Sequence, residues 1–379
     1  MIHRTRRTED CASSMPGVVF GQAWRSPGKT GRVARPVDIL DTTSPRWPTP
    51  AILTAFGAHE GAAGEGLNTR GEPLPPTQEF LNFVAKYPPL SAIGSTPMVR
   101  VDLGLDIGDA EIHVKCEHLN PGGSIKDRPI LRMLGEAILS GELTPDKTIL
   151  DATSGNAGIA YAMVGAVLGY RVELVMPENA SEERKKRLLA HGANIVYTDP
   201  MLGYDETLHE VKRRYESNPD KYFWCDQYGN MNNPQAHYDT TGEEILQQVP
   251  DVTHVVAGVG TGGTVSGVGR RLKEANPDIY VASINPPEWP GVEGLKPLGE
   301  GHIIPKTFDE SVVDERVPID VDEAYEMSKR LASKGLFAGQ SSGAYVLGAY
   351  HIAKRVRAGK IVTIFNDIGE RYFSTGMWD

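Results

Sequence analysis

The sequence predicts an α/β protein with two lobes, each a mostly parallel, twisted sheet flanked by helices. Short apolar runs typical of strands alternate with helical patterns of ten or more residues. This alternation is typical of parallel sheets whose two faces are covered by helices. The chain has 379 residues, of which 40% are hydrophobic, so it can bury a core large enough to divide into two lobes.

Eight segments are predicted to be strands, because each is short, apolar and bounded by turn residues. They are residues 111–117, 148–153, 171–176, 194–198, 222–227, 253–257, 279–284 and 361–365. Helical patterns lie between most of them, for instance at 182–191 and 322–334, where apolar residues recur every three or four positions.

Residues 1–86 are predicted to form a partly irregular N-terminal extension. They are rich in Pro, Gly, Ser and Thr, and no sustained periodicity appears before Thr77. Basic residues outnumber acidic ones in the first 37 positions. Three interpretations remain open: a transit peptide, which is typically Arg- and Ser-rich and poor in acids, a true start at Met15, or a surface arm that wraps a partner subunit.

The segment Pro121-Gly-Gly-Ser-Ile-Lys-Asp-Arg-Pro129 carries the strongest chemical signal. Pro129 and the apolar residues that follow it predict a helix with Lys126 in its first turn. Helix N-termini carry partial positive charge. An amine held there loses its proton more easily and becomes a better nucleophile. The alternative interpretation is a solvated surface lysine beside a glycine turn.

A second motif, Asp151-Ala-Thr-Ser-Gly-Asn-Ala-Gly158, joins the predicted strand 148–153 to an apolar helix at 159–168. A turn of this kind presents backbone N–H groups and small polar side chains to one point, which suits a carboxylate or a phosphate. An ordinary helix N-cap would use the same residue types.

A third motif, Thr253-His-Val-Val-Ala-Gly-Val-Gly-Thr-Gly-Gly-Thr264, runs from a buried strand into a glycine-rich turn and a helix. Its spacing Gly258-x-Gly260-x-x-Gly263 matches the dinucleotide fingerprint. That fingerprint expects an acid near the end of the next strand, whereas the first acid after strand 279–284 is Glu288. A ligand with a single phosphate therefore fits better than NAD.

Together the three motifs resemble those of the pyridoxal-phosphate (PLP) enzymes of the tryptophan-synthase-β fold type, also called fold type II, and within it the cysteine synthase and cystathionine β-synthase family. The resemblance runs from about residue 90 to the C-terminus and includes further motifs in the family's order. These are residues 93–100, 115–121, 175–178, 226–230, 237–242, 339–344 and 369–375. The resemblance implies a larger, cofactor-binding lobe at 87–125 and 228–379, and a smaller lobe at 126–227.

The resemblance also implies a role for each matching residue. Lys126 would hold PLP covalently and act as general base, Asn156 would bond the cofactor's phenolic oxygen, and Ser341 would face its pyridine nitrogen. The residues implied to surround the phosphate are Gly260, Thr261, Gly262, Gly263 and Thr264. Those implied to bind the substrate carboxylate are Thr153, Ser154, Ala157 and Gln227.

The reaction that the resemblance implies is a β-replacement on an activated serine. Elimination to an aminoacrylate would be followed by addition of a sulfur nucleophile, giving L-cysteine or a close analogue. O-acetylserine is favoured over O-phosphoserine, because residues 285–290 offer Glu288 and no cation for a phosphate leaving group. Lys296 or Arg371 would be the alternative sources of that charge.

Two other functions stay open. The segment 237–248 favours a cystathionine β-synthase, which uses serine and homocysteine. A catalytically silent PLP-binding paralogue that acts through a partner would be expected to lose the lysine or the phosphate loop, and both are present. Three positions depart from the family pattern on the substrate side, namely Ala157, Asn285 and Asp367.

Composition limits the remaining possibilities. A net charge of -10 indicates no nucleic-acid role, and no apolar run approaches the roughly 18–20 residues of a membrane helix. Cys11, Cys116 and Cys225 show no metal spacing and indicate a reducing compartment without disulfides. We therefore expect no metal, a cytoplasmic homodimer with small-molecule substrates, and leave organellar targeting by the extension open.

Overall fold

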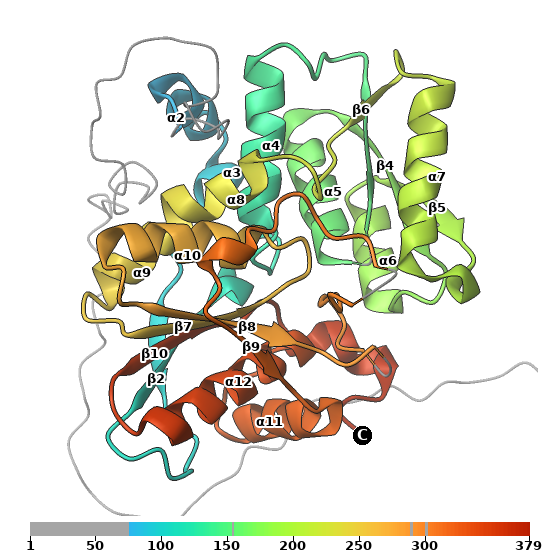
Figure 1. Cartoon of the computed structure of the whole chain (residues 1–379). Coiled ribbons are helices and arrows are strands. Elements are labelled where there is room, and N and C mark those ends of the chain that lie inside the picture. Colours follow the sequence, from blue (N-terminus) through green and yellow to red (C-terminus); the bar gives the residue numbers. More distant parts are fainter. Residues whose placement is uncertain (1–75, 154, 289–290, 300–301) are drawn as a thin grey trace, which may run out of the picture. The chain divides into compact units, whose positions relative to one another are not determined.

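The protein is seen in a computed structural model that describes residues 76–379 except 154, 289–290 and 300–301. Its strands form a six-stranded sheet of order β1-β2-β10-β7-β8-β9 and a four-stranded sheet of order β5-β4-β3-β6 (Figure 1). Helices flank both sheets, so the predicted fold class is confirmed. Most of the predicted N-terminal extension lies outside the described residues, and its end forms helix α2 (Gln78–Ala85).

The smaller sheet is fully parallel, and its inner strands β3 and β4 are buried on both faces. Its strands are β3 (Thr148–Ala152), β4 (Arg171–Pro177), β5 (Asn194–Thr198) and β6 (Tyr222–Trp224). Neighbouring residues of one strand enter different cores: Ile149 packs with α4 (Asp127–Leu139) and α5 (Asn156–Leu168), whereas Leu150 packs with Val211 of α7 (Gly203–Ser217). This is the expected consequence of the two-residue period of a strand.

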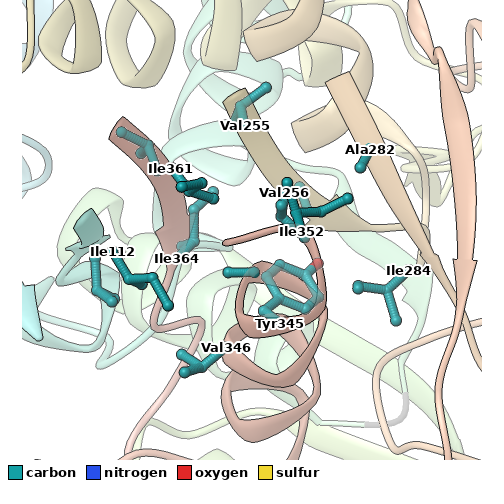
Figure 2. Close-up of a cluster of buried hydrophobic side chains, with 14 of the residues drawn as sticks. Ile112, Val255, Val256, Ala282, Ile284, Tyr345, Val346, Ile352, Ile361 and Ile364 are labelled. Carbon is teal, nitrogen blue, oxygen red and sulfur yellow. The ribbon is translucent and has the colours of Figure 1, made fainter. Parts of the chain in front are cut away.

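The larger sheet is parallel apart from its edge strand β1, which runs antiparallel to β2. Its strands are β1 (Met98–Val101), β2 (Glu111–Lys115), β7 (His254–Gly258), β8 (Tyr280–Asn285), β9 (Glu315–Pro318) and β10 (Lys360–Ile364). Helix α10 (Gly263–Ala275) covers one face and α12 (Gln340–Val356) the other (Figure 1). Figure 2 shows Tyr345, Val346 and Ile352 of α12 among the side chains of the sheet.

The remaining helical segments surround these sheets. The helices are α3 (Pro88–Ser91), α6 (Glu182–Ala190), α8 (Asn232–Ala236), the π-helix η3 (His237–Gly242), α9 (Glu243–Gln248) and α11 (Val321–Ser333). The 3-10 helices are η1 (Glu117–Leu119), η2 (Pro200–Leu202), η4 (Glu310–Val312) and η5 (Gly369–Thr375). In the part of the chain that the structure describes, no helix has the length and apolar character needed to cross a membrane.

The strands differ from the predicted ones mainly at the edges. Strands β1 and β9 were not predicted, and each has a single neighbour and only four residues. The predicted strand 222–227 ends at Trp224, and Asp226 has a φ of 50°, which an extended strand does not allow. All strands of the smaller sheet lie within 126–227, and the exact lobe boundaries remain a prediction.

A buried ionic cluster joins α4 to the larger sheet. Arg128 lies 2.7 Å from Glu117 and 2.6 Å from Glu244, and Lys115 of β2 lies 2.6 Å from Glu244. Burial alone would raise the pKa of Glu117, but the charge and hydrogen bonds of Arg128 outweigh it and lower that pKa. Buried charges need such partners, so this cluster fixes the start of α4, where Lys126 lies.

Candidate functional site

A cavity of about 780 Å³ opens at the carboxyl ends of strands from both sheets, the usual place for ligands in open α/β sheets. The structure brings ten of the predicted site residues to its wall. They are Lys126, Thr153, Asn156, Ala157, Gln227, Gly260, Thr261, Gly262, Thr264 and Ser341. Gly263 lies just behind this wall as the first residue of α10, and Ser154 lies outside the described residues.

Lys126 is the N-cap of α4, one residue before the helical turn in which the sequence placed it. Its segment is fixed by the residues that follow β10, because Ile125 N–H donates to Asn366 O at 2.9 Å. Burial lowers the pKa of the Lys126 amine, and the carboxylate of Asp367 opposes this shift. A lysine with a lowered pKa in a cavity has the properties of a nucleophile and base.

The amide of Asn156 is held at both ends by charged side chains from the C-terminal segment. Its Nδ2 donates to Asp367 Oδ2 at 2.7 Å, and its Oδ1 accepts from Arg371. Tyr372 Oη also donates to Asp367 Oδ2, at 2.9 Å. One Nδ2 hydrogen of Asn156 remains for a ligand, because an amide nitrogen carries two. Sequence reasoning noted Asp367 and segment 369–375 but assigned neither to Asn156.

The glycine-rich turn forms a cradle at the N-terminus of α10. Gly262, the N-cap, has a φ of 84°, and a Cβ there would lie 2.5 Å from Phe308 Cβ. A Cβ at Gly260 would lie 2.6 Å from Gly294 O. The turn therefore presents bare backbone to the cavity at the positive end of a helix, which is the arrangement that binds a phosphate.

Two threonines of this turn are oriented by neighbouring side chains. Thr261 Oγ1 accepts from Asn233 Nδ2 at 3.0 Å, and Thr264 Oγ1 lies 3.3 Å from His237 Nε2. Burial lowers the pKa of His237 well below its usual value, with further lowering by Lys126 and Arg128. A neutral imidazole is therefore the neighbour of Thr264.

The loop after β3 is arranged for a carboxylate. Thr153 Oγ1 accepts hydrogen bonds from the N–H groups of Gly155 at 3.0 Å and Gly158 at 2.8 Å. A hydroxyl has two acceptor positions and one donor, so the O–H of Thr153 stays available to a ligand. Ala157 and Gln227 lie on the same wall, and Gln227 Nε2 donates to Ala152 O at 2.7 Å.

Ser341 lies near the start of α12 and is buried. Its Oγ accepts from Asn366 Nδ2 at 3.2 Å, so its own O–H is left to face the cavity. The hydroxyl is neutral, unlike the carboxylate that would keep a pyridine nitrogen protonated.

The cavity also holds two charged residues that are paired with carboxylates. Lys296, which the sequence offered as an alternative source of charge for a phosphate leaving group, pairs with Asp205 at 2.8 Å. Arg184, to which the sequence assigned no role, pairs with Glu293. The Arg184 guanidinium also lies 4.9 Å from the ring centre of Tyr372. Arg184 stands in a charged helix whose pattern is that of a solvated surface helix, so no local pattern indicates its burial.

Comparison with known proteins gives concordant results. The family described as "Pyridoxal-phosphate dependent enzyme" matches residues 90–367. A cysteine synthase from Aquifex aeolicus is 46% identical over 299 residues, covering 76% of this chain and 91% of the relative. The crystal structure of cysteine synthase from Entamoeba histolytica is 35% identical, with a TM-score of 0.72, and covers 76% of this chain and 90% of that one.

A further solved structure is that of the O-acetylserine dependent cystathionine beta-synthase from Helicobacter pylori. It is 35% identical, with a TM-score of 0.70, and the match covers 77% of this chain and 98% of that chain.

Proposed function

Because this chain belongs to the pyridoxal-phosphate dependent enzyme family, we propose that it replaces the β-substituent of O-acetylserine with a sulfur nucleophile. The product is L-cysteine or a close analogue. The protein is a PLP-dependent enzyme of the cysteine synthase type. The observation that carries the proposal is that Lys126, the glycine cradle and the loop after β3 line one cavity.

The residues present fit PLP. The bare backbone of Gly260 to Thr264 would hold the phosphate, Lys126 would bind the cofactor covalently, and Asn156 and Ser341 would face its ring. When bound, PLP supplies an electron sink that makes the α-proton of an amino acid acidic. Because Ser341 is neutral, it would limit how much negative charge accumulates on the cofactor ring. This favours loss of a group from the β-carbon of the substrate.

The protein side chains supply binding and proton transfer. The free O–H of Thr153, whose oxygen is held by the N–H groups of Gly155 and Gly158, binds the substrate carboxylate. The Lys126 amine, whose pKa burial lowers, removes the proton from the α-carbon as general base.

The charge pattern of the cavity supports O-acetylserine over O-phosphoserine. Lys296 and Arg184 each have a carboxylate partner, Asp205 and Glu293 respectively, and Glu288 adds a further acid to the wall. A dianionic phosphate would have to displace these partners, whereas an acetyl group carries no charge.

Parallel assays of the two esters with sulfide test this assignment. We expect a higher kcat/KM for O-acetylserine, and expect Glu293→Gln to raise kcat/KM for O-phosphoserine selectively, because it removes the nearer carboxylate of Arg184 and leaves only Asp367, at 3.9 Å. The matched control is Glu315→Gln, which breaks an exposed pair with Arg355 remote from the cavity. A wild-type preference for O-phosphoserine would overturn the assignment.

A cystathionine β-synthase activity is the second candidate, supported by the similarity to the Helicobacter pylori structure. It predicts turnover with homocysteine in place of sulfide. A silent paralogue would bind PLP without turning over any serine ester, and the same assays would reveal it.

The proposal extends to assembly and location. We propose a cytoplasmic homodimer that binds neither membrane nor nucleic acid; the net charge of -10 and the free, buried thiols of Cys116 and Cys225 support this environment. Cys11 lies outside the described residues. Light scattering on the purified protein measures the assembly directly.

A further inference from the structure

Asp151 is a buried carboxylate directly behind the proposed carboxylate-binding loop. It lies near the end of β3 with 1% of its surface exposed, and it is not part of the cavity wall. Its Oδ2 accepts from Tyr161 Oη and from the N–H of Gln227 at 3.1 Å, and its Oδ1 accepts from the N–H of Ala152 at 2.8 Å. These partners are a phenol and two backbone amides, all of them neutral.

A buried carboxylate with neutral partners is costly, so its presence calls for an explanation. Burial raises the pKa of Asp151 to about 7, although the hydrogen bonds from Tyr161, Ala152 and Gln227 act in the other direction. An apolar residue would fill the same space without this cost. The carboxylate is therefore expected to hold something that an apolar side chain does not.

What Asp151 holds is Gln227, which is fixed at three points. Its backbone N–H donates to Asp151, and its side-chain Nε2 donates to Ala152 O at 2.7 Å. Its backbone carbonyl accepts from Asn233 Nδ2 at 2.8 Å. Asn233 also donates to Thr261 Oγ1 in the glycine cradle. Asp151 is thus the anchor that links the end of β3 to Gln227 and, through Asn233, to the cradle.

We propose that Asp151 and Tyr161 are positioning residues that fix Gln227 for binding of the amino-acid substrate, and that this function depends on an ionised Asp151. The inference rests on the proposed function, since it deepens the role of Gln227 on the cavity wall. Neither side chain touches the substrate. They act through Gln227 and through the first residues of the loop that follows β3.

The groups around Asp151 explain its sensitivity to pH. Tyr161 faces it from α5, Cys225 and Asp226 follow β6, and Tyr204 and Tyr228 lie farther away. Burial raises the pKa of Tyr161 and of Cys225 as well. Burial raises the pKa of Asp226 too, but that of Asp151 is raised to about 7. A proton on Asp151 removes the negative charge to which its three donors bind.

Tyr161→Phe and Asp151→Asn test the inference in the PLP-loaded enzyme. We measure kcat and KM for O-acetylserine, and the Kd of L-alanine, which has no leaving group. Losing one or two of these hydrogen bonds should raise KM and Kd about 3- to 30-fold, with a smaller change in kcat. The matched control is Tyr222→Phe, because Tyr222 Oη donates to the buried Glu173 at 2.7 Å in the same sheet but outside the cavity wall.

The pH dependence adds a second readout. Wild-type KM should rise as pH falls through about 7, whereas Asp151→Asn should show a high KM that does not vary over this range. A raised pKa means that ionising Asp151 opposes folding. As the pH rises from 5 to 8, the melting temperature of the wild type should therefore fall relative to that of Asp151→Asn. This measurement needs no turnover.

Equal L-alanine affinity in wild type and Tyr161→Phe would overturn the inference, as would an equal loss in Tyr222→Phe. If Asp151→Asn does not fold, Tyr161→Phe decides alone. If no serine ester is turned over, the proposed function fails, while the L-alanine affinities still test the positioning role.

Discussion

The left-handed glycine that begins α10 offers the sharpest test of the cofactor cradle. Gly262 has a φ of 84°, and a Cβ placed on it would meet Phe308 Cβ at 2.5 Å and Phe308 Cα at 2.7 Å. We predict that Gly262→Ala weakens PLP binding and lowers the stability of the fold.

The magnitude follows from two separate costs. A left-handed conformation costs a non-glycine residue roughly 1–2 kcal/mol, and overpacking against Phe308 adds roughly 1–3 kcal/mol. The overlap involves a backbone atom, so a change of rotamer cannot relieve it. If only about 1.4 kcal/mol of this total appears in binding, the Kd of PLP rises about tenfold.

Gly192→Ala is the matched control. Gly192 also has a φ of 84°, but a Cβ there would meet nothing within 4 Å, and the residue lies outside the cavity wall. The substitution Gly192→Ala therefore incurs only the free-energy cost of a left-handed backbone. Spectroscopic titration with PLP and thermal unfolding of both variants separate the backbone cost from the contact and its effect on the cradle. Equal Kd values in Gly262→Ala, Gly192→Ala and wild type would refute the reasoning.

Three further predictions concern other parts of the site. Lys126→Ala should abolish turnover and the absorption band of covalently bound PLP, and a wild-type rate would contradict its role. Arg128→Met should lower the free energy of unfolding by about 3–5 kcal/mol in urea, because it leaves the buried Glu117 without its ion-pair partner and Glu244 with Lys115 alone. Arg213→Met, which breaks an exposed pair, should cost at most about 1 kcal/mol. Ser341→Asp should slow elimination and change the visible spectrum, whereas unchanged spectra would mean that Ser341 does not face the ring nitrogen.

The central strands and the glycine turns could be predicted because their signals are local. Strand 194–198 was predicted with its observed bounds, and the others within a few residues. The burial of β3 and β4 on both faces produces continuous apolar runs that stand out in a sequence. Edge strands β1 and β9 have half-exposed residues and a single partner, so their signal is weak.

The partners of the site residues could not be predicted in the same way. Asn156 meets Asp367 and Arg371 across more than 200 residues of sequence, and no local pattern encodes such a contact. Burial of Asp151 and Arg184 is equally a tertiary property. Sequence motifs predict the groups proposed to carry the chemistry, whereas the groups that orient them are set by how the two sheets come together.

The central position of β10 in the larger sheet has a consequence for how the protein is made. This strand, Lys360–Ile364, pairs with β2 on one side and β7 on the other. Ribosomes synthesise the chain from its N-terminus, so β10 emerges long after β2 and β7. The two earlier strands cannot pair with β10 until almost the whole sequence has been made. The smaller sheet needs only residues 148–224 and can assemble earlier. The cavity at the carboxyl ends of the strands, with Asp367 and Arg371 just beyond β10, is therefore completed among the last steps of folding.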